Sequence, residues 1–411
     1  MKILYINHYA GGPKYGMEFR PHYLAREWVK SGHSVTVAAA SYAHVRTRQP
    51  EAPHRFTTEL IDGVHYVWCR TPGYDGNGVS RVLNILAFLN RLNQWKSWLP
   101  ESPDAVIASS TYPLDIYPAR SIARHFDARL VWEVHDLWPL SPMELGGMSR
   151  RHPFIMLLQR AEDTACREAN AVVSILPMTS RHLQDHGMAA GKFIHIPNGI
   201  DPSEWNTPNP GLPPAQLALI LDQARRDGHL TVGYAGSHGI ANALDTMLDA
   251  AELMRGEKVT WILIGSGPEK ARLVARTRNW NPRNLHFLDA IPKSSIPAAL
   301  RPMDVLYIGF QRQPLYRFGI GPNKLMDYMM AARPVILACE AGNDPVAEAQ
   351  CGFTIPPDSA SQLADCVRRL ASMSHDERNA LGAMGRHHVE SHLVYPVLAR
   401  RFIEAMRPGR S

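Results

Sequence analysis

Short apolar runs recur along the chain, and each is followed by turn residues or by a segment with helical spacing. In the first half these runs lie at 1–6, 34–40, 64–69, 104–110, 129–134 and 171–175. Apolar runs of this length bounded by turn residues are typical of buried strands. The segment 16–31 has apolar residues at helical spacing and ends at Gly32. The order strand, glycine loop, helix, strand predicts a doubly wound, mostly parallel sheet.

The second half repeats this order after a proline-rich segment. Its apolar runs lie at 230–236, 259–264, 285–291, 305–310 and 334–339, with a helix predicted over 241–255. The segment between the halves carries Pro208, Pro210, Pro213 and Pro214, which indicates a connection followed by a short helix. Because 411 residues are too many for one core, we expect two domains. We place them at 1–205 and 230–390, with a linker at 206–229 and a C-terminal helix at 391–411 that packs back on the first domain.

The segment 79–99 has the spacing of an amphipathic helix and contains no acidic residue. Its apolar positions are Val82, Leu86, Leu89, Leu92 and Trp95, and its charges are Arg81, Arg91 and Lys96. Most amphipathic helices in globular domains pack on a core, which is one interpretation. The other is a helix at a membrane surface, with Trp95 and Trp98 at headgroup level and the apolar stripe in the acyl boundary.

The formal net charge of +6 suits phosphate-bearing substrates or an anionic membrane surface. It is too weak to indicate a nucleic-acid binder, and zinc-finger or RNA-binding motifs are absent from the sequence. The five cysteines form no C-x-x-C pair, which fits reduced thiols in a cytoplasm, and we expect no metal site. Apolar runs of 18 residues are also absent, so we expect a cytoplasmic protein whose membrane contact is peripheral.

A candidate ligand site lies in the segment 319–337, which reads as glycine loop, helix and strand. Gly319 and Gly321 permit a tight turn, and Pro322 suits the first position of a helix. Lys324 lies in the first helical turn, where the helix dipole disfavours a cation, and Asp327 lies one turn later on the same face. A bound anion would explain the lysine, and the carboxylate could accept from sugar hydroxyls. An ordinary connection between helix and strand is an equally open interpretation.

Polar residues and glycines also follow strands of the first half. Gly11 and Gly12 come after the first strand, but without the full G-x-G-x-x-G spacing, so turn glycines remain an alternative. His135 and Asp136 come at the end of the run 129–134, where ligands bind in parallel sheets. A histidine at a strand end is more often a structural hydrogen-bonding group. The alternative is a functional pair of His135 with Asp136, because an imidazole near a developing diphosphate or a sugar hydroxyl can stabilise charge or pass a proton.

Several of these stretches resemble family 4 retaining glycosyltransferases, and the resemblance covers nearly the whole chain. The donor-binding signature of that family resembles the run Gly321-Pro-Asn-Lys-Leu-Met-Asp-Tyr-Met-Met-Ala-Ala-Arg-Pro-Val-Ile. The acceptor-side motif resembles Val131-Trp-Glu-Val-His-Asp-Leu-Trp-Pro, and the hinge-proximal signature resembles Pro197-Asn-Gly-Ile-Asp. The resemblance implies the GT-B architecture, which consists of two Rossmann-like α/β domains that face a cleft.

The resemblance also assigns roles to individual residues. It implies that Asp327 binds the nucleotide ribose, that His135 lies at the base of the cleft, and that Gly11 and Gly12 approach the donor phosphates or the acceptor. The walls of the nucleobase pocket resemble two stretches of this chain, namely the turn with Gly265 and Gly267 and the segment 288–292 with Ile291.

The chain departs from the family pattern in two respects. Many members have an arginine and a lysine that clamp the pyrophosphate, and the matching positions here are Ser237 and Asn242. The first glutamate of the family's paired motif is replaced by Gly319. We therefore assign the charge of a leaving diphosphate to Lys324, to Arg317 and to the backbone amides after Gly321. Gly321, Pro322 and Asn323 are expected to bind the donor.

The resemblance implies a retaining transferase that moves a hexose-type sugar from a nucleotide sugar, with UDP as the expected nucleotide. An N-acetylated amino sugar is expected, as in fucosaminyltransferases. The expected acceptor is a lipid-linked glycan of bacterial O-antigen or capsule biosynthesis at the inner face of the membrane, without metal, cofactor or covalent nucleophile. Two alternatives are a sugar-nucleotide epimerase on the same architecture and a non-catalytic sugar-binding subunit.

Overall fold

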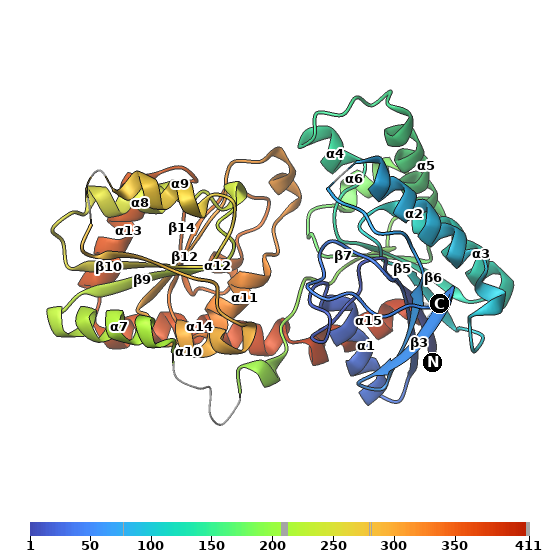
Figure 1. Cartoon of the computed structure of the whole chain (residues 1–411), viewed down its shortest axis with the longest axis horizontal. Helices are drawn as coiled ribbons and strands as arrows, with labels where there is room; N and C mark the ends of the chain where they lie inside the picture. Colours follow the sequence, from blue (N-terminus) through green and yellow to red (C-terminus); the bar gives the residue numbers. More distant parts are fainter. Residues whose placement is uncertain (77, 207–212, 279, 281, 408–411) are drawn as a thin grey trace. The chain divides into compact units, whose positions relative to one another are not determined.

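The computed structural model describes residues 1–76, 78–206, 213–278, 280 and 282–407, and it divides the chain into two compact units (Figure 1). Unit 1 comprises 1–198 and 395–411, and unit 2 comprises 199–394. Part of the predicted linker, 207–212, lies outside the described residues. Trp205, which we expected in the first domain, belongs to unit 2 because its buried ring and carbonyl bind Asp327 and Arg301 of that unit.

The sheet of unit 1 has the strand order β3-β4-β2-β1-β5-β6-β7-β8. Its strands are β1 (Lys2–Ile6), β2 (Ser34–Ala40), β3 (Phe56–Ile61), β4 (Val64–Cys69), β5 (Ala105–Ala108), β6 (Arg129–Val134), β7 (Ala171–Ser174) and β8 (Phe193–His195). The edge strand β3 is antiparallel to β4, and the other pairs are parallel. The parallel arrangement confirms the sequence-based prediction, whereas β3 and β8 were not predicted.

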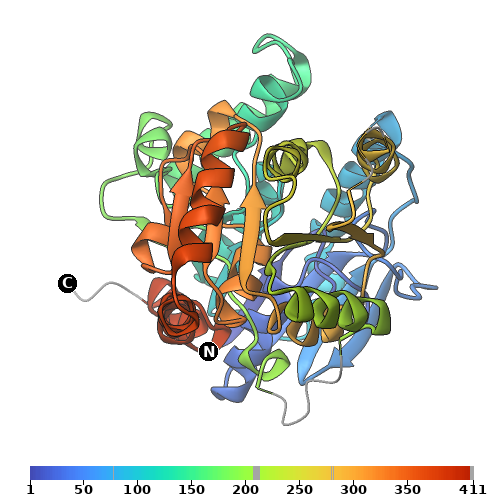
Figure 2. The same cartoon turned by 90° about the vertical axis from the view of Figure 1, so that its left-hand side faces the viewer.

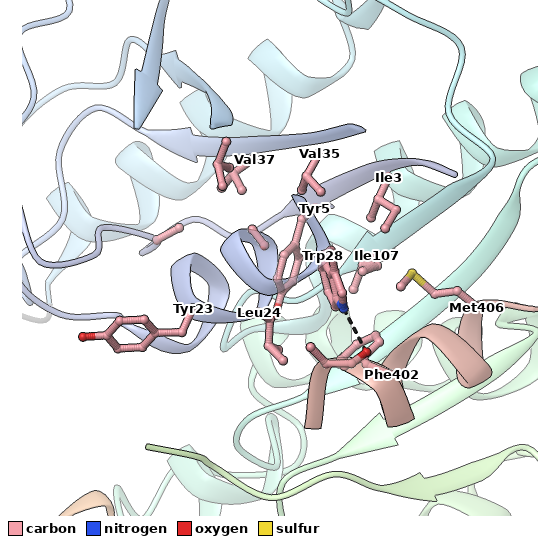
Figure 3. Close-up of a cluster of buried hydrophobic side chains, with 14 of the residues drawn as sticks. Ile3, Tyr5, Tyr23, Leu24, Trp28, Val35, Val37, Ile107, Phe402 and Met406 are labelled. Carbon is pink, nitrogen blue, oxygen red and sulfur yellow. Dashed lines mark hydrogen bonds between the residues drawn. The ribbon is translucent and has the colours of Figure 1, made fainter. Parts of the chain in front are cut away.

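Helices cover both faces of this sheet. They are α1 (Arg20–Lys30), α2 (Val79–Leu92), α3 (Ile116–Phe126), α4 (Leu140–Glu144), α5 (Pro153–Glu168), α6 (Ser180–Asp185) and α15 (Tyr395–Met406). Figure 3 shows the core between the sheet, α1 and α15. There the indole N–H of Trp28 donates to the carbonyl of Ala399 at 3.0 Å, and its ring contacts Phe402. The last helix of the chain therefore completes the core of the first unit.

The helix predicted from 79–99 ends at Leu92 and is followed by a short 3-10 turn. Trp95 and Trp98 are both buried, because Trp95 packs on Phe126 and the indole of Trp98 donates to the carbonyl of Arg91. The hypothesis that these two tryptophans lie at the level of lipid headgroups is therefore wrong. The apolar side chains that α2 leaves exposed are Val79, Leu83 and Leu86.

The sheet of unit 2 is parallel throughout, with the order β11-β10-β9-β12-β13-β14. Its strands are β9 (Leu230–Ala235), β10 (Val259–Ile264), β11 (Leu285–Leu288), β12 (Val305–Gly309), β13 (Val335–Ala338) and β14 (Gly352–Ile355). The strand order reverses between β9 and β12, and ligands of open parallel sheets bind at the carboxyl ends beside such a reversal. Of these strands only β14 was not predicted.

The helices of unit 2 also lie on both faces of their sheet (Figures 1 and 2). They are α7 (Ala215–Asp227), α8 (Asp245–Leu253), α9 (Lys270–Thr277), α10 (Ile296–Leu300), α11 (Asn323–Met330), α12 (Pro345–Glu348), α13 (Ala360–Ser372) and α14 (His375–His392). α8 packs on α13 over one face around Trp261 and Tyr307, and α11 packs on α14. Within the described part of the chain, every helix is too short or too polar to cross a membrane.

Candidate functional site

A cavity of about 510 Å³ lies at the carboxyl ends of the strands of unit 2. It is lined by 235–237 at the end of β9, by 264–267 at the end of β10, by 290–291 after β11, and by Ile296, Lys324 and Asp327. The structure thus brings five predicted residues into one cavity. These five are Gly265, Gly267, Ile291, Lys324 and Asp327.

Glycines allow two loops to meet at the floor of this cavity. Gly265 and Gly267 have φ values of 153° and 155°. A Cβ at Gly265 would lie 1.9 Å from the carbonyl oxygen of Gly236, and one at Gly267 would lie 2.5 Å from that of His238. A side chain at either position would therefore push the loops after β9 and β10 apart. The floor is built of backbone, which a flat or anionic ligand can approach closely.

Lys324 is held in the cavity by neutral groups. Its ammonium donates to the hydroxyl of Tyr234 at 3.0 Å and to Oδ1 of Asn242. Burial lowers the pKa of Lys324 to about 8, because desolvation disfavours the charged ammonium. Asn242, which occupies a position of the family's missing clamp, instead positions this lysine. The cavity therefore contains a cation whose electrostatic partner would be supplied by an anionic ligand.

The first turn of α11 explains how Lys324 reaches the cavity. The helix begins at Asn323, and Pro322 precedes it with extended backbone, one residue later than the sequence predicted. Gly319 has a φ of 101°, a conformation that favours glycine, whereas Gly321 does not have a positive φ. Gly321, Pro322 and Asn323 therefore form the entry to the helix, and the role we predicted for them toward a ligand stays a prediction.

Asp327 lies one turn further along α11 and also lines the cavity. Burial raises the pKa of its carboxyl to about 6, with Lys293 and the Trp205 hydrogen bond acting in the opposite direction. The indole N–H of Trp205 donates to Oδ1 at 3.2 Å. Among the described residues, Oδ2 receives no hydrogen bond. This oxygen is thus available to accept from the hydroxyls of a ligand.

Lys270 is a residue of the site that sequence reasoning missed. Its ammonium donates to the carbonyls of Gly265 and Leu288 at 2.9 and 2.8 Å and to Oδ1 of Asp289 at 2.7 Å. It thereby ties together the loops after β10 and β11 that line the cavity. Burial, together with the charges of Lys270 and Lys324, lowers the pKa of the buried His238 to about 4. The electrostatic field in this region is therefore positive.

His135 lies in unit 1, at the end of β6, within a buried polar network. Its Nε2 lies 2.9 Å from Oγ of Ser109 and 3.1 Å from Oε2 of Glu133. Glu133 also accepts from the Arg20 guanidinium at 2.9 Å and from the Tyr5 hydroxyl at 2.5 Å. Burial lowers the pKa of His135, but the charge and hydrogen bond of Glu133, together with the charge of Glu18, raise it, and the net shift is upward.

The pairing of His135 with Asp136 that the sequence suggested is wrong. Asp136 accepts from the backbone of Leu137, from the indole of Trp138 and from the hydroxyl of Ser141. The carboxylate partner is Glu133, because side chains two residues apart share one face of a strand. A lone glutamate within the apolar run 129–134 was the signal that would have identified it.

Besides His135 and the helix entry 321–323, three further predicted site residues do not line the cavity of unit 2. Gly11 and Gly12 belong to unit 1. A Cβ added at Gly11 would lie 2.7 Å from the carbonyl oxygen of Gly16, and one added at Gly12 would lie 2.7 Å from Cγ of His22. Local packing alone thus requires both glycines. Arg317 lines a separate cavity of about 500 Å³, and its guanidinium donates to the carbonyl of Pro314. The ligand roles of these three residues stay predictions.

Comparisons with known proteins agree with this arrangement. Residues 15–204 match the family model described as Glycosyltransferase Family 4, and 229–373 match Glycosyl transferases group 1. The putative colanic acid biosynthesis glycosyl transferase WcaI of Escherichia coli (strain K12) is 22% identical over 399 residues, which cover 93% of this chain and 94% of that protein. The probable glycosyltransferase WbjE of Pseudomonas aeruginosa is 21% identical over 311 residues, 74% of each protein.

The crystal structure of Anabaena Alr3699/HepE in complex with UDP-glucose superimposes with a TM-score of 0.64 at 15% identity, covering 98% of both chains. A likeness at this identity supports the fold. The family matches lie in both units, and the relatives align along most of the chain. The chain therefore belongs to the family 4 glycosyltransferases and has the GT-B fold.

Proposed function

We propose that the chain is a retaining glycosyltransferase that binds a UDP-sugar in the cavity of unit 2 and transfers its sugar to a lipid-linked glycan. The observation that carries this proposal is the placement of Lys324 and Asp327 on one face of α11, in a cavity whose floor is glycine backbone. A cation held by neutral partners suits a diphosphate, and a carboxylate one turn deeper suits the hydroxyls of a ribose.

Each part of the donor then has a counterpart in the cavity. The diphosphate lies against Lys324 and the start of α11, and the ribose lies against Asp327. The nucleobase lies between the backbone of 265–267 and that of 290–291, which Lys270 ties together. As the bond to the sugar breaks, negative charge grows on the leaving diphosphate, and Lys324 stabilises that charge more strongly than in the ground state.

His135 contributes from unit 1 in this proposal. Its raised pKa shifts the ring toward the imidazolium relative to a free histidine, and the Glu133 carboxylate fixes the orientation of the ring. An imidazolium can donate to a sugar hydroxyl or to the departing phosphate. Because Glu133 is held by Arg20 and Tyr5, the ring is oriented before substrate binds.

The names of the relatives support the substrate class. HepE was crystallised with UDP-glucose, and WcaI is named for colanic acid biosynthesis. We extend to this chain a UDP-sugar donor, with an N-acetylated amino sugar as the expected sugar, and a role in bacterial surface polysaccharide synthesis. The acceptor proposed is a glycan linked to a lipid at the cytoplasmic face of the membrane.

Exposed apolar side chains of unit 1 support contact with that membrane. Val79, Leu83 and Leu86 of α2 are 76%, 55% and 48% exposed, and the helix carries no acidic residue. Exposed leucines on a helix whose charges are basic suit the boundary of an anionic bilayer. Lipid contact through these three residues replaces the contact through tryptophans that the sequence suggested.

Product analysis tests the proposed reaction. The full chain is incubated with UDP-sugars in the presence and absence of lipid-linked glycans, and UDP release and product configuration are followed by NMR. We expect UDP release that depends on the acceptor and a product with the anomeric configuration of the donor. Conversion of a UDP-sugar without acceptor would instead identify an epimerase, and binding without any conversion would identify a sugar-binding subunit.

A further inference from the structure

A cluster of metal-ligating side chains joins α5 and α6 in unit 1 and shares no residue with the sites described above. It consists of Glu162 and Asp163 of α5 and of His182 and His186 at α6. The two histidines are four residues apart, and their ring centroids are 4.7 Å apart. Histidines at this spacing lie on the same helical face, where they can share one ion.

The distances within the cluster are close to those of a metal centre. Glu162, His182 and His186 each offer one ligand atom, and these atoms lie within 4.8 Å of one another. Nε2 of His182 is 3.1 Å from Oε1 of Glu162. Bonds of about 2.0–2.1 Å in a tetrahedral site separate two ligand atoms by about 3.3 Å, so only side-chain adjustments are needed to admit the ion.

The charges of the cluster favour a cation. Glu162 is 1% exposed, and a buried carboxylate is costly unless a positive charge lies beside it. Within the described part of the chain, neither Glu162 nor Asp163 forms an ion pair with lysine or arginine. Their partners are imidazoles, which carry charge only when protonated, and the amide of Gln159. A bound dication would supply positive charge independently of histidine protonation.

The cluster is also accessible to an ion from solvent. The side chains of His182 and His186 are 15% and 24% exposed, and that of Asp163 is 30% exposed, whereas Glu162 lies beneath them. Oδ1 of Asp163 lies 2.9 Å from Nδ1 of His186. A carboxylate at this distance from a ligating histidine orients its ring in many metal sites.

We propose that Glu162, His182 and His186 bind one divalent transition-metal ion of the zinc class and that the ion fastens α6 to α5. Two imidazoles and one carboxylate form a ligand set typical of zinc, whereas magnesium prefers oxygen ligands alone. The proposal departs from our expectation of a chain without metal. The sequence does not indicate it directly because Glu162 lies 20 residues before His182, on another helix.

Zinc titration of the purified full chain tests the proposal, after removal of any affinity tag and dialysis against a chelator. Binding is measured by competition with a chromophoric chelator, and thermal stability is measured with zinc and with magnesium. We expect saturable uptake of one zinc ion per chain and a melting temperature that rises with zinc but not with magnesium. Absence of saturable uptake at micromolar zinc would overturn the proposal.

Variants locate the ion. In His182→Gln the new amide can still donate to Glu162 but is a poor zinc ligand, and His186→Gln acts in the same way on the second imidazole. Each should weaken zinc binding by about tenfold or more and remove the zinc-dependent rise in melting temperature. The matched control is His392→Gln. His388 and His392 are also four residues apart, with ring centroids 5.1 Å apart, but among the described residues they belong to no cluster of metal-ligating side chains.

Unchanged zinc affinity in both cluster variants, or an equal loss in His392→Gln, would contradict the assignment. If His182→Gln fails to melt cooperatively, two other measurements test the metal site. They are zinc binding by His186→Gln and the visible absorption of the parent chain loaded with cobalt. A tetrahedral cobalt centre absorbs strongly in the visible range, so a loaded parent chain without that absorption would overturn a site of this geometry.

Discussion

The substitution Asp327→Asn should stabilise the free protein while it weakens nucleotide binding. Burial raises the pKa of Asp327 from 3.8 to about 6, so the folded chain holds this proton more tightly than the unfolded chain does. A group of this kind contributes stability below its unfolded pKa and loses it as the pH rises through the folded pKa. At pH 7.5 the loss is complete, because the carboxyl is then ionised in both states.

The size of the effect follows from the same shift. Each pKa unit corresponds to about 1.4 kcal/mol, so ionised Asp327 costs about 3 kcal/mol at pH 7.5. Asparagine avoids the buried charge and can still accept from Trp205, which lies 3.2 Å from Oδ1. Because the amide must also be desolvated, we expect a gain of about 2 kcal/mol, or about 4–8 °C for a unit of this size.

Scanning calorimetry of the free protein at pH 7.5 and pH 5 measures this gain, which should shrink at the lower pH as Asp327 becomes protonated. Isothermal titration should show that UDP and uridine both bind about 10-fold or more weakly, since a charged acceptor for the ribose is lost. Asp365→Asn, at an exposed position, should change neither quantity. A lower melting temperature at pH 7.5, or unchanged affinity for uridine, would refute the reasoning.

Three further predictions concern the lysine, the histidine and the exposed helix. Because burial lowers the pKa of Lys324 to about 8, the free protein loses this proton as the pH rises. The affinity for UDP relative to uridine should therefore fall by several-fold between pH 7 and pH 9. Lys324→Arg should abolish this fall in the same titrations. His135→Ala should lower kcat by about 100-fold with little change in donor affinity, and equal activity in a cooperatively melting variant would make the residue structural. The double variant Leu83→Glu, Leu86→Glu should not co-sediment with anionic vesicles at low salt. The control Leu219→Glu, which alters an exposed leucine of α7, should still co-sediment. Unchanged sedimentation of the double variant would contradict the proposed membrane surface.

Hydrophobic patterning predicted the parallel strands because such strands are buried on both faces and appear as continuous apolar runs. The strand β3 escaped prediction because Thr57, Thr58 and Glu59 interrupt its apolar pattern. The edge strands β8 and β14 are short and only partly buried. Edge strands have one neighbour, so less of their surface must be apolar.

The candidate site was predicted to the extent that it depends on one helix. Lys324 and Asp327 share a face of α11, and spacing alone indicates this. Their partners Tyr234, Asn242 and Trp205 lie 82 to 122 residues away in the sequence, and only the packed structure brings them together. Local spacing likewise misassigned the partner of His135, because the neighbouring Asp136 satisfies its oxygens within its own turn.

Above all, we propose that the ammonium of Lys324 recognises the diphosphate of a nucleotide sugar in the cavity of unit 2. Its most direct test is the affinity of UDP and of uridine for the parent chain, for Lys324→Met and for the control Lys258→Met, which alters an exposed lysine of the same unit. We predict that Lys324→Met weakens UDP binding by about 10-fold or more and leaves uridine binding within about twofold, while the control changes neither. Equal losses for UDP and uridine, or no loss for UDP, would contradict it.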